Sequence, residues 1–374
     1  MGLFRLLLAM VIVRQHFGKS FLYYPIGGGV ALECFFIISG FYMSLVLNEK
    51  YVSHKISFSE LYTFYSNRLL RILPVYWIFL LLKIIVSVVS LQLNCCLHQT
   101  RTLVFFQNHF DSLTTTSAIA LIFSNVMVFG LDLFCTVLNI GADGGLFLSA
   151  EPTPMSACRF VFIPPAWALS TIFYFYLIVP FLFRKNIVWI LSIIGASFLA
   201  RILTFRLIQS SLLEKEVFPF ELALFLLGIV SYRIYIAVAA QRDRYLFLGK
   251  VALATVIAVT LGYPLLPSTQ TFPYFFSDAA IIYFALVMLG IPFIFLVSQK
   301  SKIDRFLGEL AFPLYICHYM VILFFGYPMA AKSPAVVAII FFISLMLSAA
   351  SVILVVQPIN RWRQIRLQAK RGKR

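Results

Sequence analysis

The sequence predicts an all-α fold, a polytopic transmembrane helix bundle of about ten spanning helices. Hydrophobic residues make up 61% of the 374 residues and charged residues 12%, whereas a soluble domain is roughly 45–50% apolar and about 25% charged. The apolar residues gather in repeated stretches close to the length of about 20 residues that a spanning helix requires. Lys and Arg stand mainly in the short segments between these stretches and in the C-terminal region.

Several stretches are apolar enough to be candidate spans. They are residues 3–22, 26–47, 72–93, 117–138, 165–183, 187–207, 218–238, 247–266, 278–297, 308–328 and 334–356. The stretch 117–138 is the weakest, because Asn125, Gly130 and Asp132 interrupt it. We expect this stretch to be re-entrant or interfacial, which is tolerated at membrane depth where the backbone is buried in protein.

The distribution of charge predicts the orientation of the chain. Segment 48–70 and the turns at 184–185, 241–244 and 298–305 carry Lys and Arg, and such segments usually mark the cytoplasmic side. Both termini are therefore expected in the cytoplasm, which requires an even number of crossings. Residues 1–360 then form the integral membrane domain, residues 361–374 form a basic cytoplasmic tail, and loop 139–164 faces outward.

The formal charge of +16 does not indicate a nucleic-acid-binding protein, because the basic residues sit beside apolar spans. There they are expected to contact anionic lipid headgroups, so membrane lipids are expected partners and nucleic acid is not. The six Cys residues show no metal-ligand spacing and do not indicate a disulfide framework. No metal site is expected.

The first stretch, "RLLLAMVIVRQHFG", carries Arg5, Arg14 and His16. On a helix, Arg5 and His16 share roughly one face and lie about 16 Å apart, whereas Arg14 points to a different neighbour. One interpretation is that Arg5 snorkels to the interface and His16 sits among the outer headgroups. The other is functional, since ionisable residues inside spans usually line a cavity or a substrate path.

The second stretch, "GGGVALECFFIISGF", places Glu33 within an apolar run. An unpaired carboxylate there would be costly, so Glu33 is expected to be protonated or paired with a cation such as Arg14 or His16. Glu33 is either a structural contact that joins two helices or a functional group. Ser39 and Gly40 are expected to permit close helix packing.

Two arginines begin the third stretch, "FYSNRLLRILPVYW". Arg68 and Arg71 are three positions apart and so project from one helical face, where two guanidinium groups can grip phosphates. The alternative is ordinary anchoring by positive charge, together with an aromatic belt that includes Tyr76 and Trp77.

Two more ionisable residues occur late in the chain. Glu221 in "PFELALFLLG" has two interpretations. The first is a carboxylate at a helix start, and the second is a functional group. His318 in "GELAFPLYICHYMVI" is either a satisfied bundle histidine or a catalytic one.

Taken in chain order, these motifs resemble the membrane-bound acyltransferase-3 family. "GVALECFFIISGFYM" and the following "NEKY" are especially similar to the branch that acts on exopolysaccharide and lipopolysaccharide. The resemblance implies a multi-pass protein of the cytoplasmic (inner) membrane that takes an acyl group, most often acetyl, from acetyl-CoA or another acyl-CoA. The expected acceptor is an extracytoplasmic carbohydrate or lipid-linked glycan, and partner proteins of glycan assembly are also expected.

The resemblance also implies roles for individual residues. Arg5 and His16 match the Arg-x10-His pair, with His16 as the catalytic imidazole, and Glu33 falls where the family often has an acid or amide. Arg68 and Arg71 match the pair that handles the acyl-CoA donor. Residues expected to support the site are Arg14, Ser39, Tyr76, Trp77, Trp167, Glu221 and His318.

Two departures from the family pattern affect these roles. Ile172 in "WALSTI" and Gln357 in "VVQP" stand where many members have an acid. The acid role is expected to move to Glu33 or Glu221, or not to be needed. We expect no appended hydrolase-like domain of the kind that some members carry, so a second acyl transfer would need a partner protein.

A mechanism follows as an expectation. His16 acts as general base on an acceptor hydroxyl or carries the acyl group covalently, with Glu33 or Arg14 setting its tautomer or stabilising the oxyanion. Two other classes of protein remain as alternatives: a secondary transporter, which also uses ionisable residues at the midplane, and a non-catalytic membrane component of glycan assembly or export.

Overall fold

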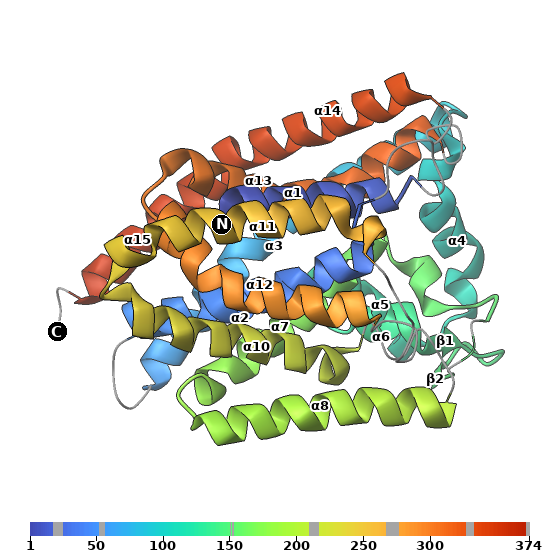
Figure 1. The fold of residues 1–374 in the computed structure, drawn as a ribbon. Coiled ribbons are helices and arrows are strands. Elements are labelled where there is room, and N and C mark those ends of the chain that lie inside the picture. The colour runs from blue at the N-terminus through green and yellow to red at the C-terminus, as the bar shows by residue number, and fades with distance from the viewer. Residues whose placement is uncertain are drawn as a thin grey trace.

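Long apolar helices make up most of the structure (Figure 1). It is a computed structural model and describes residues 1–17, 25–51, 57–149, 151, 153–208, 217–266, 277–326 and 333–371. Its helices are α1 (Gly2–Gln15), α2 (Gly28–Lys50), α3 (Phe58–Gln92), α4 (Arg101–His109), α5 (Thr115–Met127), α6 (Leu131–Thr136), α7 (Trp167–Leu182), α8 (Ile187–Ile208), α10 (Phe218–Ala239), α11 (Arg242–Gly262), α12 (Asp278–Ser298), α13 (Lys302–Phe325), α14 (Pro334–Ser351) and α15 (Gln357–Arg371). Strands β1 (Leu138–Ile140) and β2 (Leu146–Leu148) form a short antiparallel hairpin.

Within the described residues, nine helices are long and apolar enough to cross a membrane. Helix α1 has only 14 described residues, yet it packs inside the bundle along α13 and α2. The prediction of an all-α membrane bundle is confirmed, and the nine helices together with α1 agree with about ten crossings. The part of the first candidate span that follows residue 17 lies outside the described residues.

The stretch 117–138 does not form a spanning helix. Helix α5 ends at Met127, and α6 begins after Gly130. The residues that flank this break, Val128 and Gly130, have positive φ, 70° and 84°. The hydroxyl of Tyr76 donates to the Asn125 carbonyl at 2.6 Å, and the indole N–H of Trp77 donates to the Val126 carbonyl at 2.7 Å. The end of α5 is thus attached to the middle of α3, as expected of a re-entrant segment. Tyr76 is fully buried and bonds to backbone, so the belt interpretation is wrong for this residue.

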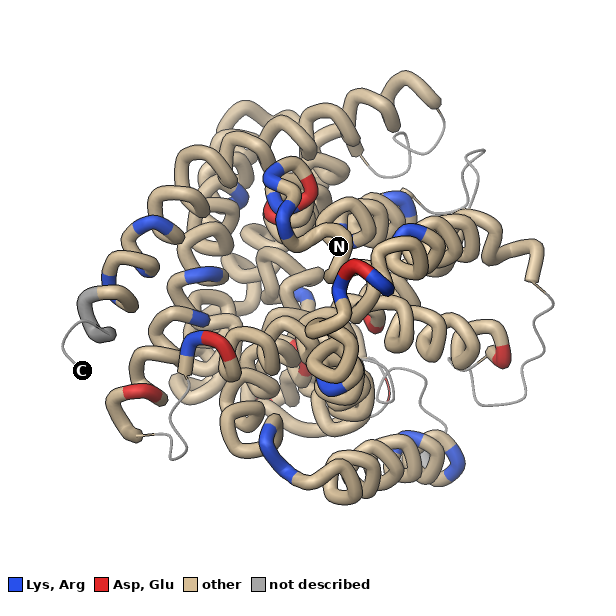
Figure 2. The backbone as a smooth tube through the Cα atoms, turned by 60° about the vertical axis from the view of Figure 1, so that its left-hand side comes forward, with Lys and Arg blue, Asp and Glu red and all other residues tan. Residues whose placement is uncertain are grey.

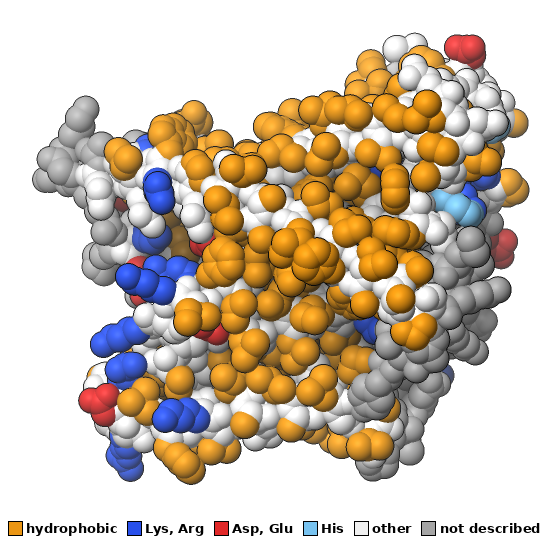
Figure 3. Space-filling view, turned by 90° about the horizontal axis from the view of Figure 1, so that it is seen from above, with side chains coloured by type: hydrophobic (Ala, Val, Ile, Leu, Met, Phe, Trp, Pro, Cys, Tyr) orange, Lys and Arg blue, Asp and Glu red, His pale blue; other side chains and the backbone are white. Residues whose placement is uncertain are grey.

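The two ends of the bundle differ in charge. Lys and Arg stand chiefly at turns between helices and on α15 (Figure 2), and in the face shown in Figure 3 they gather along one edge of a broad apolar surface. We call this the basic end; the turns at 184–185, 241–244 and 298–305 lie there. Helices α4–α6 and the β-hairpin gather at the opposite end (Figure 1).

A disulfide between Cys135 and Cys158 joins the end of α6 to the segment before α7. We call this side of the bundle the disulfide end. The expectation that the cysteines form no disulfide framework is therefore wrong for this pair, which 23 residues separate in sequence. Disulfides persist in oxidising compartments, which agrees with the prediction that loop 139–164 faces outward.

The C-terminal basic segment is not separate from the bundle. A π-helical segment, Val352–Val356, joins α14 to α15. Arg366 of α15 donates to the Ser66 hydroxyl at 3.1 Å, and Arg363 is buried. The part of the predicted tail that the structure describes, residues 361–371, therefore continues a helix that packs against α3.

Glycines on both helices allow α2 and α10 to approach at backbone distance. A Cβ atom on Gly40 of α2 would lie 1.9 Å from the Phe225 carbonyl oxygen of α10, and one on Gly228 would lie 2.1 Å from the Ile37 carbonyl oxygen. The close packing predicted for Gly40 is confirmed. Ser39, one position earlier, lines a cavity instead.

Candidate active site

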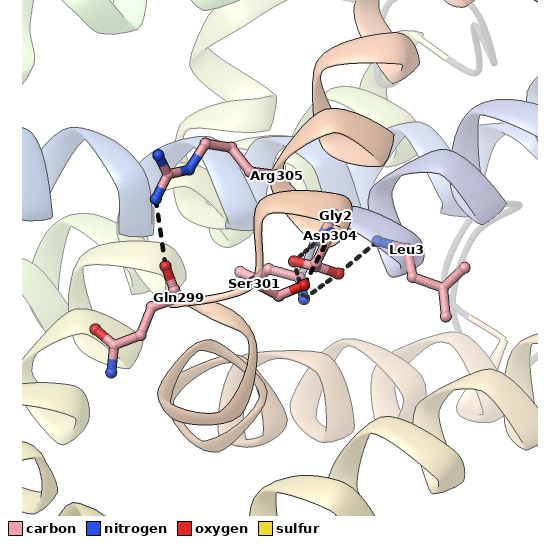
Figure 4. Close-up of polar contacts among 7 residues, drawn as sticks. Gly2, Leu3, Gln299, Ser301, Asp304 and Arg305 are labelled. Carbon is pink, nitrogen blue, oxygen red and sulfur yellow. Dashed lines mark hydrogen bonds and ion pairs between the residues drawn. The ribbon is translucent and has the colours of Figure 1, made fainter.

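The start of α1 is fixed against the first turn of α13. The Asp304 carboxylate accepts hydrogen bonds from the N–H groups of Gly2 at 2.7 Å and Leu3 at 2.9 Å, and it pairs with the Met1 ammonium at 3.2 Å (Figure 4). A Cβ atom on Gly2 would overlap the Asp304 carbonyl oxygen, so the two helices touch at the backbone. These contacts set the position of every α1 residue relative to α13.

Two histidines meet at the far end of this helix pair. The ring of His16, which follows α1, lies 4.9 Å from the ring of His318 and 5.8 Å from that of Tyr319, measured between centroids. His318 is fully buried, whereas His16 is half-buried. His16 and His318, which the sequence analysis selected independently of each other, are thus in direct contact.

The hydrogen bonding of His318 indicates its tautomer. Its Nδ1 lies 3.3 Å from the Leu314 carbonyl oxygen. Because a carbonyl only accepts hydrogen bonds, Nδ1 carries the proton, and Nε2 of the neutral ring is left as an acceptor. Nε2 is buried and has no hydrogen-bond partner among the described residues.

A cavity of about 130 Å³ lies toward the basic end, and we call it the basic-end cavity. Its polar lining includes Arg5, Tyr42, Arg71 and Glu309, and Tyr315 of α13 also lines it. The guanidinium carbon of Arg5 lies 5.7 Å from the centroid of the Tyr42 ring. The cavity therefore brings together two of the arginines that the sequence analysis selected.

Arg68 and Arg71 have different surroundings although they share a helix face. Arg71 is exposed and lines the basic-end cavity. Arg68 is buried, and its Nη1 lies 3.8 Å from the sulfur of Met43. Lys50 and Arg363 are both within electrostatic range of the two arginines. Within the described ranges, neither Arg68 nor Arg363 forms an ion pair.

A second cavity, of about 800 Å³, lies toward the disulfide end, and we call it the disulfide-end cavity. Residues from α4, from the segment between Cys158 and Pro164 and from α13 line it. The α13 residues in its wall are Tyr319 and Leu323.

Helix α13 places the histidine pair between these two cavities. Tyr315 lines the basic-end cavity and Tyr319 lines the disulfide-end cavity, and the two Cα atoms are one turn, about 6 Å, apart along the helix. His318 lies between them in sequence, 6.0 Å from Tyr315 between ring centroids. The hydroxyl of Tyr315 donates to the Pro165 carbonyl, two residues before Trp167, which begins α7. The described linings of the two cavities do not include His16 or His318, but each cavity is lined by a tyrosine that contacts one of these rings.

Glu33 has a partner that the sequence analysis did not name. Arg201 of α8 donates to the Glu33 carboxylate at 2.9 Å and lies 3.9 Å from that of Glu221 on α10. All three residues are buried. An Arg within the apolar stretch 187–207, six residues before its end, was the signal available in the sequence. Arg14, which we also expected as a partner, is buried in the last turn of α1.

Arg201→Leu is expected to lower the free energy of unfolding by about 3–5 kcal/mol, because two buried carboxylates lose their shared cation. Thermal unfolding of the purified protein in detergent measures this effect. Arg206→Leu is the matched control, because Arg206 lies on the same helix and is exposed. Equal unfolding midpoints for the two variants would contradict the inference that Arg201 holds this cluster together.

The acidic residue at the basic-end cavity is not one of those expected to replace the missing family acids. Ile172 lines this cavity, and so does Glu309, to which the side-chain amide of Asn360 donates at 3.4 Å. Glu33 and Glu221 meet at Arg201. We therefore assign the acid of the cavity to Glu309, which the sequence analysis had only quoted within a motif.

Another buried cation missed from the sequence is Lys83 of α3. Its ammonium donates to the backbone carbonyl of Gln99 at 3.0 Å and to the side-chain oxygen of Gln99 at 2.5 Å. The Gln99 amide donates in turn to the Met320 carbonyl of α13 at 2.5 Å. Gln99 thus attaches the segment before α4, and with it a wall of the disulfide-end cavity, to the helix that carries His318, and Lys83 attaches the same segment to α3. Among the described residues, no three His, Cys, Asp or Glu side chains gather as they would around a metal ion.

Comparison with known proteins gives one match. A family model described as an acyltransferase domain matches residues 2–355, nearly the whole chain. No curated protein and no solved structure matches the sequence.

Proposed function

The chain belongs to the acyltransferase-3 family of multi-pass membrane acyltransferases, and from this premise we propose that it transfers an acyl group from cytoplasmic acyl-CoA to a glycan hydroxyl across the membrane. The observation that carries the proposal is the His16–His318 pair between the basic-end and disulfide-end cavities. The acyl group is acetyl and the membrane is the cytoplasmic one, as the resemblance implies.

The donor binds at the basic end, which faces the cytoplasm because Lys and Arg mark that side. Phosphates of acyl-CoA bind Arg71 at the mouth of the basic-end cavity, in the positive field of Lys50, Arg68 and Arg363. The cavity volume of about 130 Å³ is smaller than the roughly 300–1,000 Å³ of sites that enclose a small molecule. It therefore admits the slender pantetheine arm past Arg5 and leaves the nucleotide outside.

The acceptor enters from the disulfide end and reaches His16. Being half-buried, His16 can contact the acceptor, whereas His318 is fully buried and acts as a positioning residue. His16 takes the proton of the acceptor hydroxyl as the oxygen bonds to the thioester carbonyl carbon. The carbon–sulfur bond then breaks, and the departing thiolate takes up a proton to give free CoA.

Purified protein in lipid nanodiscs is expected to move labelled acetyl from acetyl-CoA to the glycan fraction of the producing cell, with one CoA thiol released per acetyl transferred. Surface glycans from cells that lack the gene should lose the mass of one acetyl group at the modified position. A protein that binds no acyl-CoA would instead be a non-catalytic component. Movement of label across sealed vesicles without glycan modification would indicate a transporter.

A further inference from the structure

The disulfide-end cavity carries positive charge without a matching acid. Arg101 of α4 and Arg159, which lies between Cys158 and α7, both line it. Among the described residues of its lining, none is Asp or Glu. Asp111, which follows α4, is exposed and lies outside this lining. In the part of the chain that the structure describes, neither arginine forms an ion pair.

Contacts with the cavity wall hold the guanidinium group of Arg159. Its carbon lies 4.0 Å from the centroid of the Phe105 ring, and Nη1 donates to the Pro154 carbonyl at 2.6 Å. A guanidinium group has five N–H donors, so most of them stay available to a ligand. A planar group fixed in this way can bind a carboxylate or a phosphate through two parallel hydrogen bonds.

The size and the other walls of the cavity suit a saccharide of more than one ring. Its volume of about 800 Å³ lies in the upper part of the roughly 300–1,000 Å³ range of small-molecule sites. Phe162 and Tyr319 supply apolar ring surface, and Thr100 and Asn108 supply groups that hydrogen-bond to hydroxyls. Tyr319 also contacts His16, so the wall that meets an occupant of the cavity includes a neighbour of the proposed base.

We propose that the disulfide-end cavity is the acceptor site and that Arg101 and Arg159 select glycans that carry a carboxylate or a phosphate group. This inference rests on the proposed acyl transfer and adds the chemical class of the acceptor. An anionic acceptor neutralises the two arginines as it binds, and their positive field raises its rate of association. A neutral glycan of the same size gains neither effect.

The test uses the full-length protein in nanodiscs, labelled acetyl-CoA and the total glycan fraction of the producing cell, resolved on an anion-exchange column. We expect the label in the retained, anionic fraction. Prior reduction of carboxyl groups should abolish labelling if the anion is a carboxylate, and prior removal of phosphate esters should do so if it is a phosphate. Label confined to the unretained, neutral fraction overturns the inference and leaves acyl transfer standing. No label in any fraction overturns the proposed function itself.

The double variant Arg101→Gln/Arg159→Gln is expected to raise the KM for the anionic acceptor about tenfold. Its kcat and its affinity for acetyl-CoA should stay unchanged. Measuring both quantities also tests whether the variant folds. The double Lys variant should recover part of the loss, because the charge returns without the planar fork. Arg206→Gln is the matched control, an exposed arginine outside this cavity. An unchanged KM in the double Gln variant overturns the assignment of these two arginines.

Discussion

Replacing His16 with alanine is expected to lower kcat for acyl transfer by about 10²–10⁴-fold, the range that a positioned general base contributes. The affinity for acyl-CoA should not change, because the site proposed for the donor phosphates lies at the other end of α1. Initial rates with labelled acetyl-CoA and equilibrium binding of the donor measure the two quantities separately.

Met10→Ala is the control for His16→Ala, because Met10 lies on the same helix and is 43% exposed. Transfer at the wild-type rate by His16→Ala would exclude both roles considered for this residue. Mass spectrometry of the wild-type protein after incubation with donor alone separates them. An acyl group found on His16 indicates the covalent relay, and its absence after rapid quenching indicates a general base.

Replacing Arg71 with alanine is expected to raise the Kd for acyl-CoA about 10–100-fold, the effect of losing charge-assisted hydrogen bonds to phosphate. With saturating donor, kcat should stay close to that of the wild type, because Arg71 lies at the cavity mouth and away from the histidines. Added salt should weaken donor binding less in the variant than in the wild type, because screening acts on a charge that the variant lacks.

Arg305→Ala serves as the control for Arg71→Ala, since Arg305 is exposed at the basic end and its side chain reaches the Gln299 carbonyl. Arg68→Ala provides a further contrast. Arg68 is buried beside Met43. Its loss should therefore lower the stability of the protein, and the effect on the Kd for acyl-CoA should be smaller than that of Arg71→Ala. Donor affinity that is unchanged in Arg71→Ala would remove this residue from the donor site.

The membrane bundle could be predicted because lipid leaves the backbone few choices. A spanning segment must satisfy its own hydrogen bonds, so apolar stretches of the right length become helices. Asn125, Gly130 and Asp132 interrupt one such stretch and correctly indicated that it does not span. The spacing of Arg5 and His16 predicted a shared helix face. In the structure, Arg5 lines the basic-end cavity and His16 contacts His318.

The partners of these residues could not be predicted, because partners depend on which helices become neighbours. The sequence shows Glu33 and Arg201 in two different apolar stretches and gives no sign that α2 and α8 bring them within 2.9 Å. Helical periodicity predicted one face for Arg68 and Arg71, but it says nothing of the C-terminal helix that returns to α3. The spacing of Cys135 and Cys158 likewise did not reveal the disulfide.

The contact between the start of α1 and Asp304 has a consequence for how this protein can vary. One end of α1 is held by hydrogen bonds from its backbone N–H groups to the Asp304 carboxylate, and its other end presents His16 to His318. Inserting one residue between them would turn the imidazole by about 100° and move it by about 1.5 Å along the axis. Substitutions among apolar residues within the helix leave that placement intact. Over this segment, natural variants should therefore differ in composition far more readily than in length.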